Sequence, residues 1–300
     1  MTRFVATFLF VFVFAGADRA AAEFYRYIDK SGREHFVDKI SSVPDEYRSQ
    51  VTAGEGLAQE AGQASVSLPF TDPIAWFKAE TLGSSPDVKV AEWTSSQGSS
   101  VPVRQLEVSP QPKTSVDAKL GKTFLRFDGR NDYMTSDSIA TAIRAAKAVT
   151  AVYVVRTDRD SPQFVWSVHA VDKFTDVIRA GFLNLSRGRL KAGEQPLDYL
   201  DSSTIQAGKL SVYTAIFEED RSRLFFNGRQ VLSKAPQKPV DFKKAATFTI
   251  GQEWDKGKPS DYFRGEMAEL VIFGRALPEE ERRSLEKELM ERYSINIEED

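Results

Sequence analysis

The chain has 300 residues, and its 40 Lys and Arg against 43 Asp and Glu give a formal net charge of −3, a balance that argues against a nucleic-acid partner because such proteins carry a basic face. The absence of Cys excludes a disulfide scaffold, thiolate zinc sites, a Cys nucleophile and a Cys-anchored lipoprotein, and two His exclude a His-rich metal site. Because 21 Phe and four Trp supply ample material for a core, a wholly disordered chain is also excluded.

Residues 1–22 have the three parts of a secretory signal peptide. Arg3 supplies a positive charge, residues 4–17 form an apolar run, and residues 20–22 are all Ala, which fits cleavage before Glu23. The apolar run is short for a membrane span, which takes about 20 residues, although an uncleaved membrane anchor is the alternative. The sequence therefore predicts an exported protein, periplasmic or outside the cell, with no membrane span after cleavage.

Residues 23–48 predict a small β-hairpin module. The aromatic run 24–28 favours a strand, residues 29–32 have turn chemistry, and residues 33–37 favour a returning strand. The matching positions are Tyr25-Arg26-Tyr27-Ile28-Asp29, Gly32, His35-Phe36, Pro44 and Tyr47-Arg48. This pattern resembles a short domain of unknown function that is common at the N-terminus of bacterial exported proteins. The resemblance implies an envelope protein and no chemistry.

Residues 49–70 are rich in Ala, Gly, Gln and Ser, which predicts a flexible linker. The remainder contains many short strand-like runs separated by turn residues. These predicted strands are residues 74–79, 123–127, 149–156, 163–169, 176–185, 212–218, 223–226, 229–232, 246–251 and 267–273. Asn227-Gly228 marks a two-residue hairpin, because both turn positions need φ > 0. Regularly spaced short strands favour an antiparallel sandwich.

Residues 278–293 predict a helix that closes the chain. Pro278 suits the first turn, where a missing N–H costs nothing, and the three Glu at 279–281 suit the positive end of the helix dipole. Leu285, Leu289 and Tyr293 recur at i, i+4 and i+8 and form one narrow apolar stripe. We therefore expect this helix to pack on a sheet. Residues 138–147 are a second, shorter helix candidate.

Three ordered stretches carry a family pattern. They are Ala75–Ala79 with Val90–Thr94, Leu125–Met134, and Gly265–Leu277 with the helix after it. Together they resemble the laminin-G-like, concanavalin A-like jelly roll of bacterial exported proteins, over nearly all of residues 71–297. The resemblance implies an all-β fold, a two-sheet antiparallel jelly-roll sandwich with a C-terminal helix, beside the N-terminal β-hairpin module. It implies no single activity, because such folds serve as sugar binders, protein binders, adhesion modules and enzyme-attached domains.

The family sometimes binds calcium, which makes three carboxylates candidate ligands. Asp128 and Asp132 flank a Gly-containing turn, and clustered oxygen ligands suit Ca²⁺. The resemblance allows Glu269 to join them from its strand. The alternative for Asp128 is an Asx-turn, in which the side chain bonds nearby backbone. The alternative for Glu269 is a buried carboxylate satisfied by backbone N–H groups. The loop after Trp93 departs from the family pattern, which weakens a metal or ligand role there.

Glycan recognition calls for an aromatic platform, and Trp254 with Tyr262 is the candidate ligand-binding pair. Trp254 lies in a polar stretch, so an exposed indole is one expectation, and a side chain folded back on the sandwich rim is the other. Trp76 and Trp166 lie within predicted strands and are expected in the core. The family resemblance adds no residue to this pair.

Catalysis finds little support in the sequence. Retaining glycosidases need two carboxylates about 5.5 Å apart, and neither Glu218–Asp220 nor Glu253–Asp255 is followed by the further acid of the usual strand pattern. His169 is a candidate general base, but a lone His in a strand is more often structural. The leading hypothesis is a non-catalytic module that contacts a glycan or an envelope protein through rim loops. The alternatives are a glycan-cleaving hydrolase or lyase and a structural envelope protein.

Overall fold

The computed structural model describes residues 24–28, 34–37, 43–50, 52–54, 72–98, 101–157, 160–171, 176–184, 187–192, 195–200 and 207–296. The chain divides into two compact units, residues 1–65 and 66–300. The predicted signal peptide lies outside the described residues, as does most of the predicted linker. No helix among the described residues is both long enough and apolar enough to cross a membrane.

The first unit contains a small antiparallel sheet. β1 (Phe24–Ile28) pairs with β2 (Glu34–Val37), as the predicted hairpin requires, and a 3₁₀ helix, η2 (Asp45–Gln50), follows. The other edge of β1 pairs with β3 (Thr52–Gly54). This third strand falls within the stretch predicted to be a linker, so the linker prediction is wrong at its start. A third strand supports a hairpin that would be marginal alone.

The second unit is a sandwich of two eight-stranded antiparallel sheets, which confirms the predicted fold class. The first sheet has the order β17-β16-β15-β10-β21-β8-β7, and β4 also pairs with β21. Its strands are β4 (Pro73–Lys78), β7 (Lys113–Asp117), β8 (Lys122–Asp128), β10 (Ala148–Arg156), β15 (Ser211–Glu218), β16 (Ser222–Phe226), β17 (Arg229–Lys234) and β21 (Arg264–Phe273).

The second sheet has the order β14-β13-β12-β11-β18-β9-β6-β5. Its strands are β5 (Glu92–Thr94), β6 (Pro102–Arg104), β9 (Met134–Ser136), β11 (Gln163–His169), β12 (Asp176–Asn184), β13 (Arg187–Ala192), β14 (Gln195–Leu200) and β18 (Thr247–Ile250). A short hairpin of β19 (Glu253–Asp255) and β20 (Lys258–Ser260) lies against it, because the backbone N–H of Trp254 donates to His169 Nε2. The predicted strands are present with small shifts in their ends.

Turn and cap chemistry place the connections. Asn227 and Gly228 join β16 to β17 with φ of 44° and 84°, as predicted for this dipeptide. The short helix α1 (Asp137–Arg144) is capped by Ser136, whose hydroxyl accepts the N–H of Ile139. Two 3₁₀ helices, η3 (Ala79–Leu82) and η4 (Phe242–Lys244), complete the described elements.

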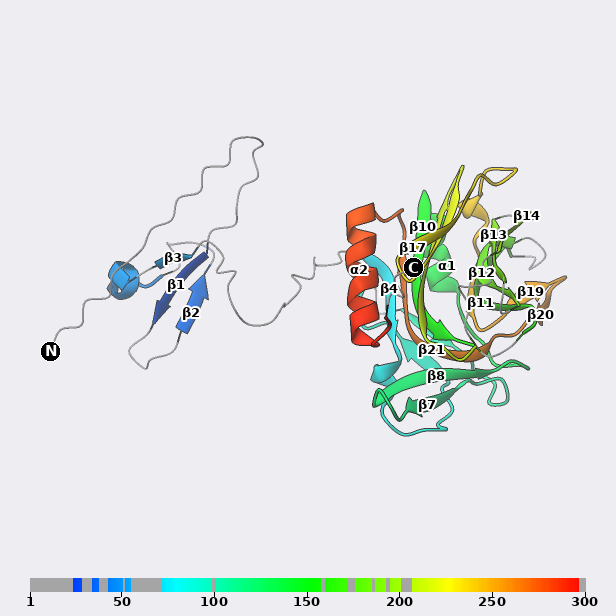
Figure 1. The fold of residues 1–300 in the computed structure, drawn as a ribbon, viewed down its shortest axis with the longest axis horizontal. Coiled ribbons are helices and arrows are strands. Elements are labelled where there is room, and N and C mark those ends of the chain that lie inside the picture. Colours follow the sequence, from blue (N-terminus) through cyan, green and yellow to red (C-terminus); the bar gives the residue numbers. More distant parts are fainter. Residues whose placement is uncertain are drawn as a thin grey trace. The chain divides into compact units, whose positions relative to one another are not determined.

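The predicted terminal helix is present as α2 (Glu279–Arg292), and it adds a third layer. One apolar core fills the space between the sheets, and a second lies between the first sheet and α2, where Leu285, Leu289 and Tyr293 are buried. Figure 1 shows α2 against the first sheet, on the side away from β11 to β14. Strand β10 is therefore buried on both faces, which accounts for its continuous β-branched run rather than an alternating one.

Strand β21 extends beyond the part of the sheet that α2 covers. One edge pairs with β10, and the other is shared by β8, along residues 264–267, and β4, along residues 269–273. We call the face of the first sheet that points away from the second sheet its outer face. The helix packs on the outer face beside β4, and the segment of β21 beside β8 carries charged residues instead.

Candidate ligand-binding groove

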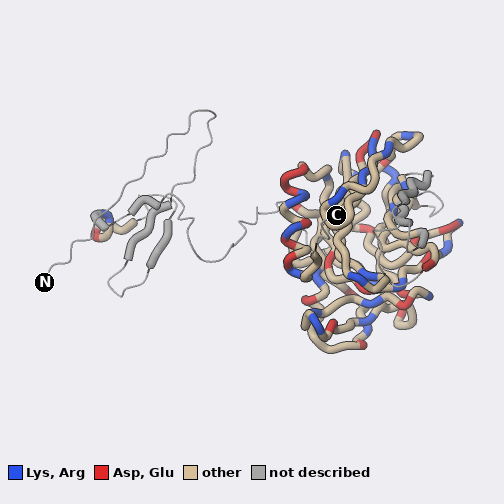
Figure 2. The backbone as a smooth tube through the Cα atoms, in the orientation of Figure 1, with Lys and Arg blue, Asp and Glu red and all other residues tan. Residues whose placement is uncertain are grey.

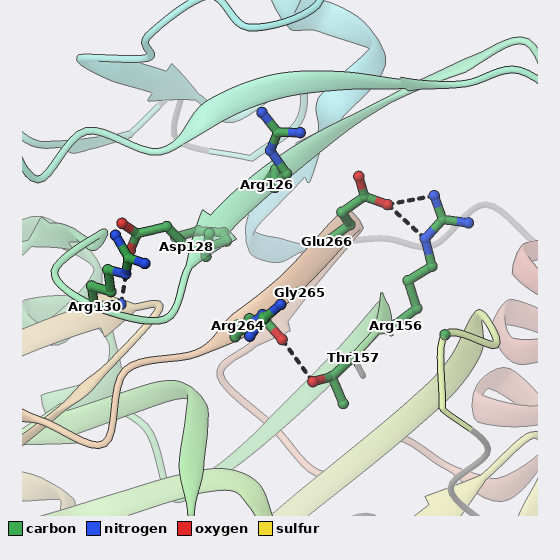
Figure 3. A pocket seen from close by; sticks show the side chains of 10 residues that line it. Arg126, Asp128, Arg130, Arg156, Thr157, Arg264, Gly265 and Glu266 are labelled. Carbon is green, nitrogen blue, oxygen red and sulfur yellow. Dashed lines mark hydrogen bonds and ion pairs between the residues drawn. The ribbon is translucent and has the colours of Figure 1, made fainter. Parts of the chain in front are cut away.

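A row of charged side chains crosses the outer face where β7, β8, β21 and β10 lie side by side. In the strand register, Lys113 of β7 lies opposite Arg126 of β8. Arg126 lies opposite Glu266 of β21, and Glu266 lies opposite Arg156 of β10. Directly opposed residues of antiparallel strands point to the same face. One acid therefore stands between an arginine on each neighbouring strand, as Figure 3 shows.

A second charged pair follows two residues further along the strands. Asp128 is opposite Arg264. A cavity of about 490 Å³ opens here, a size typical of small-molecule sites. Its lining is Arg126, Phe127, Asp128, Arg130, Arg156, Thr157, Gly208, Arg264, Gly265 and Glu266. Four of these ten residues are arginine.

Glu266 and Arg156 hold each other inside this cavity. Arg156 Nε donates to Glu266 Oε2 at 2.6 Å, and its Nη1 donates to Asp117 Oδ2 at 2.6 Å. The hydroxyl of Ser115 donates to the other oxygen of Glu266 at 2.6 Å. Both oxygens of Glu266 thus accept hydrogen bonds, and the Arg156 guanidinium donates to two carboxylates, those of Glu266 and Asp117.

The turn after β8 forms the ridge beside this cavity. Asp128 Oδ1 accepts the backbone N–H of Arg130 at 2.8 Å and of Asn131 at 3.2 Å. This is the Asx-turn that was the alternative to a calcium ligand. Asp132 Oδ2 accepts the backbone N–H of Asp128 at 2.8 Å and closes the turn from its other end. The geometry fixes the backbone of Arg130 while its side chain stays exposed.

Asp132 is a buried carboxyl, with 6% of its surface exposed. Burial raises its pKa to about 6, and the nearby Asp128 carboxylate adds to this effect, while the Asp128 N–H and the lysines Lys113 and Lys89 lower it. The turn therefore contains one solvated acid and one acid that is partly protonated near neutral pH.

A second cavity, of about 790 Å³, lies on the other side of the turn. Its lining is Lys89, Ser109, Gln111, Lys113, Arg126, Asp128, Arg130, Asn131 and Asp132. Three residues, Arg126, Asp128 and Arg130, line both cavities, so the two adjoin. We call these two cavities, with the turn 128–132 between them, the groove.

The predicted calcium ligands do not come together. Asp128 and Asp132 share the turn, but Glu269 lies five residues beyond Arg264, the partner of Asp128, which is roughly 15 Å along a strand. Glu269 accepts instead from Trp76 Nε1 at 2.6 Å. No three acidic or His side chains among the described residues form a metal-holding group. The cations around the turn also oppose Ca²⁺, so these residues do not fit a calcium site.

The predicted aromatic pair consists of one buried residue, Trp254, and one half-buried residue, Tyr262. Trp254 is only 9% exposed, and its Nε1 donates to Thr249 Oγ1 at 3.1 Å. The ring packs edge-on against Tyr133 with centroids 6.2 Å apart. The hairpin β19–β20 thus folds the indole onto the sandwich, and Trp254 is not an exposed binding residue. Tyr262 is half-buried, and burial raises its pKa, with Tyr133 and Asp128 contributing.

The other candidates from the sequence have structural roles. Trp76 and Trp166 are 3% and 1% exposed, which confirms the core prediction. His169 is fully buried, and its Nε2 accepts the backbone N–H of Trp254 at 3.3 Å. Glu253 forms an ion pair with Arg179. These contacts support the structural interpretation of His169 and leave Glu253 engaged.

The groove arginines were missed at the level of sequence. The signal that was available is the alternation Leu125-Arg126-Phe127, in which the arginine faces out between two buried residues. Arg156 and Arg264 carry no local marker, because only strand pairing brings them beside Arg126.

Comparison with known proteins supports the architecture. No curated protein matches this chain. Among solved structures, a Trypanosoma rangeli sialidase in complex with a difluoro-KDN ligand has a TM-score of 0.52 at 13% identity, over 76% of this chain and 34% of that one. The CBM40 of Ruminococcus gnavus IT-sialidase, bound to α2,3 sialyllactose, has a TM-score of 0.46 at 12% identity, over 54% of this chain and 95% of that one.

A Streptococcus pneumoniae NanB sialidase mutant has a TM-score of 0.45 at 13% identity, over 53% of this chain and 27% of that one. The chain thus spans about a third or less of the two sialidases, and likeness at these identities concerns the fold. A family model of laminin G type matches residues 128–281, just over half of the chain. The chain therefore belongs to the concanavalin A-like lectin/glucanases superfamily.

Proposed function

We propose that this chain is an exported, non-catalytic module that binds a glycan in the groove. The observation that carries the proposal is the pair of adjoining cavities, of about 490 and 790 Å³, around a rigid turn. Both volumes lie in the range of ligand sites, and both linings are rich in groups that donate hydrogen bonds to sugar oxygens. The superfamily name joins lectins and glucanases, which is consistent with a sugar ligand.

The state of the groove acids favours binding over cleavage. Glu266 is occupied by Arg156 and Ser115, and Asp132 is buried and accepts a backbone N–H. Asp128 holds its own turn. A glycosidase needs one carboxyl to protonate the leaving group and a second to act as nucleophile or base. Carboxylates that are already committed to the fold suit a binding site better.

A glycan array tests the proposal. The purified chain should be retained by at least one class of polysaccharide, and the double variant Arg130→Ala/Lys113→Ala should lose that retention while its unfolding temperature stays close to that of the unmodified chain. Arg130 and Lys113 line the groove, and neither forms an ion pair within the described part of the chain, so replacing their side chains breaks no ion pair there. Retention by an envelope protein, with no glycan bound, would favour the protein-binding alternative.

A second candidate, glycan cleavage, is favoured by one observation. Asp132, whose burial raises its pKa to about 6, lies beside the exposed Asp128, and a carboxyl whose pKa is raised by burial is a feature of acid–base catalysis. The test is the release of new reducing or unsaturated ends from polysaccharides. Cleavage that Asp132→Asn abolishes would establish the enzyme and overturn the non-catalytic proposal.

A further inference from the structure

The charge of the groove is opposite to that of the chain. The chain carries a net charge of −3, yet among the described residues the two cavities are lined by six basic residues and three acidic ones. The basic residues are Lys89, Lys113, Arg126, Arg130, Arg156 and Arg264. Charged residues of both signs that were evenly mixed would not give such an excess of basic residues. Along α2, by contrast, Figure 2 shows basic and acidic residues interspersed.

We infer that the ligand is an acidic polysaccharide, whose carboxylate or sulfate groups are bound by Arg130, on the turn, and Lys113, on β7. This inference rests on the proposed function and specifies its substrate class. The ligand is a polymer rather than a single sugar because the two cavities adjoin across the turn. A chain of several acidic sugars fills both cavities, and one acidic sugar fills one of them.

The six cations are not equally available. Arg156 is bound by Glu266 and Asp117, so it positions Glu266 more than it attracts a ligand. Arg126 shares one guanidinium nitrogen with Asp87 in an exposed ion pair. Within the described part of the chain, no carboxylate pairs with Arg130 or Lys113. Lys89 Nζ donates to the backbone oxygen of Val108 at 2.6 Å, and Arg264 lies opposite Asp128. Arg130 and Lys113 are therefore the two groove cations most available to a ligand.

The turn orients Arg130 for this contact. Its backbone N–H donates to Asp128 Oδ1 at 2.8 Å, and this hydrogen bond fixes the backbone from which the side chain extends. A guanidinium presents a planar fork of donors that matches the two oxygens of a carboxylate or sulfate. Lys113 lines the same cavity and is directly opposite Arg126 on the neighbouring strand. The cavity thus presents positive charge from three elements: β7, β8 and the turn.

The lack of aromatic surface separates this ligand class from two others. Of the lining residues that the structure describes, Phe127 is the one aromatic, and it is 1% exposed. Single-stranded nucleic acid depends on aromatic side chains for base stacking, and neutral sugars depend on aromatic faces beside polar groups. A groove with charge and without an exposed ring therefore fits acidic sugars better than either.

Affinity gels containing polygalacturonate, dextran sulfate, neutral dextran or single-stranded DNA test the inference. We expect retention by one or both acidic polysaccharides, weakening from 50 to 500 mM NaCl because salt screens exposed charges. Arg130→Gln/Lys113→Gln should weaken that retention at least tenfold. Arg221→Gln is the control: it removes one exposed arginine in the turn between β15 and β16, and Arg221 is not among the residues that line the groove.

Each outcome is decisive. Equal retention by neutral dextran, or no loss in the double variant, overturns the acidic-ligand inference and leaves a glycan-binding function standing. Retention by none of the polysaccharides, extended to the array, overturns both. Retention by DNA as tight as by the acidic polysaccharides makes the groove a general polyanion site and also overturns the inference. Galacturonate trimers that bind no better than the monomer overturn the two-cavity arrangement.

Discussion

Two glutamates of β21 lie on the same outer face of the first sheet and meet opposite surroundings. Glu269 is 1% exposed beneath the end of α2, where Arg292 Nη1 donates to it at 2.5 Å and the hydroxyl of Tyr293 at 2.9 Å. Glu266 faces the groove, with Arg156 beside it. A β-bulge opposite Val154 and Val155 places both on one face despite their odd spacing.

The difference follows from where the helix ends. Beneath α2 the Glu269 carboxylate is closed off from water, so it must have partners, and the ion pair with Arg292 serves the fold. Beyond α2 the same face is open, so charges there interact with solvent or with a ligand. One sheet face thus contains a structural charge network and a candidate recognition site, separated by a few residues of β21.

Glu269→Ala is expected to have the largest effect on stability, because it removes the acid of the structural charge network. It leaves Arg292, Tyr293 and Trp76 without their shared acceptor, and breaking a buried ion pair costs about 3–5 kcal/mol. The free energy of unfolding, measured in urea, should fall by that amount. Glu291→Ala removes an exposed acid of the same helix that pairs with Lys287 and should change stability by less than about 0.5 kcal/mol. Similar losses in both variants would contradict the burial argument.

A pH titration tests the raised pKa of Asp132, the buried acid of the groove. Because the pKa of Asp132 is raised to about 6, the folded state binds a proton that the unfolded state releases, and the stability this gives below pH 4 is lost as the pH rises through 6. Relative to Asp132→Asn, the unmodified chain should lose on the order of 3 kcal/mol between pH 4 and 7, by urea unfolding at each pH.

Asp117→Asn is the control for this titration. The backbone N–H of Leu120 and then the Arg156 side chain lower the pKa of Asp117, so the stability that this acid contributes is lost only as the pH falls below its ordinary pKa. The difference between Asp117→Asn and the unmodified chain should stay constant from pH 5 to 7. Parallel stability curves for Asp132→Asn and the unmodified chain would show that Asp132 ionises normally.

Gly251→Ala probes the packing beneath the turn. A Cβ there would lie 2.5 Å from the ring of Phe127 and 2.9 Å from the backbone oxygen of Asp132. Gly251 has φ of +91°, and Gly121→Ala shares a positive φ with nothing within 4 Å, so it is the matched control. The Gly251 variant should be about 1–3 kcal/mol less stable than the control variant by thermal unfolding. Equal stabilities would mean that Phe127 moves aside freely.

Local patterns predicted much of the fold. Asn227-Gly228 predicted its hairpin because a positive φ at two successive residues leaves few alternatives. Pro278 and the glutamates after it predicted the start of α2 because caps act over one turn. In both cases the cause lies within a few residues, which is the range that a sequence pattern covers.

The site was harder to predict because it depends on pairing between distant strands. The sequence and its family resemblance leave Glu269 either a calcium ligand or a carboxylate buried against backbone N–H groups, since no nearby residue indicates that the side chains of Arg292 and Tyr293 cover it. Trp254 lies in a polar stretch, yet the β19–β20 hairpin folds its ring inward. Arg156 and Arg126 lie in one row because the strand between theirs, β21, places Glu266 opposite both of them. Such juxtapositions arise from topology, which single-sequence patterns leave open.

The smallest expected effect concerns the exposed ion pair at the groove margin. Asp87→Asn releases Arg126, and because the two side chains are 67% and 45% exposed, stability should change by less than about 1 kcal/mol. Asp87 has φ of 60°, which Asn tolerates. Retention on polygalacturonate should rise about twofold, since one more groove cation becomes available.

Glu92→Gln sharpens this last expectation. Glu92 forms a similarly exposed pair with Arg104 on the second sheet, and neither residue is among those that line the groove, so freeing that arginine should leave retention unchanged. A rise in both variants would mean that net charge alone governs binding. A rise in Asp87→Asn alone would place the recognition on the open half of the outer face, where the helix leaves the charges of the sheet to the ligand.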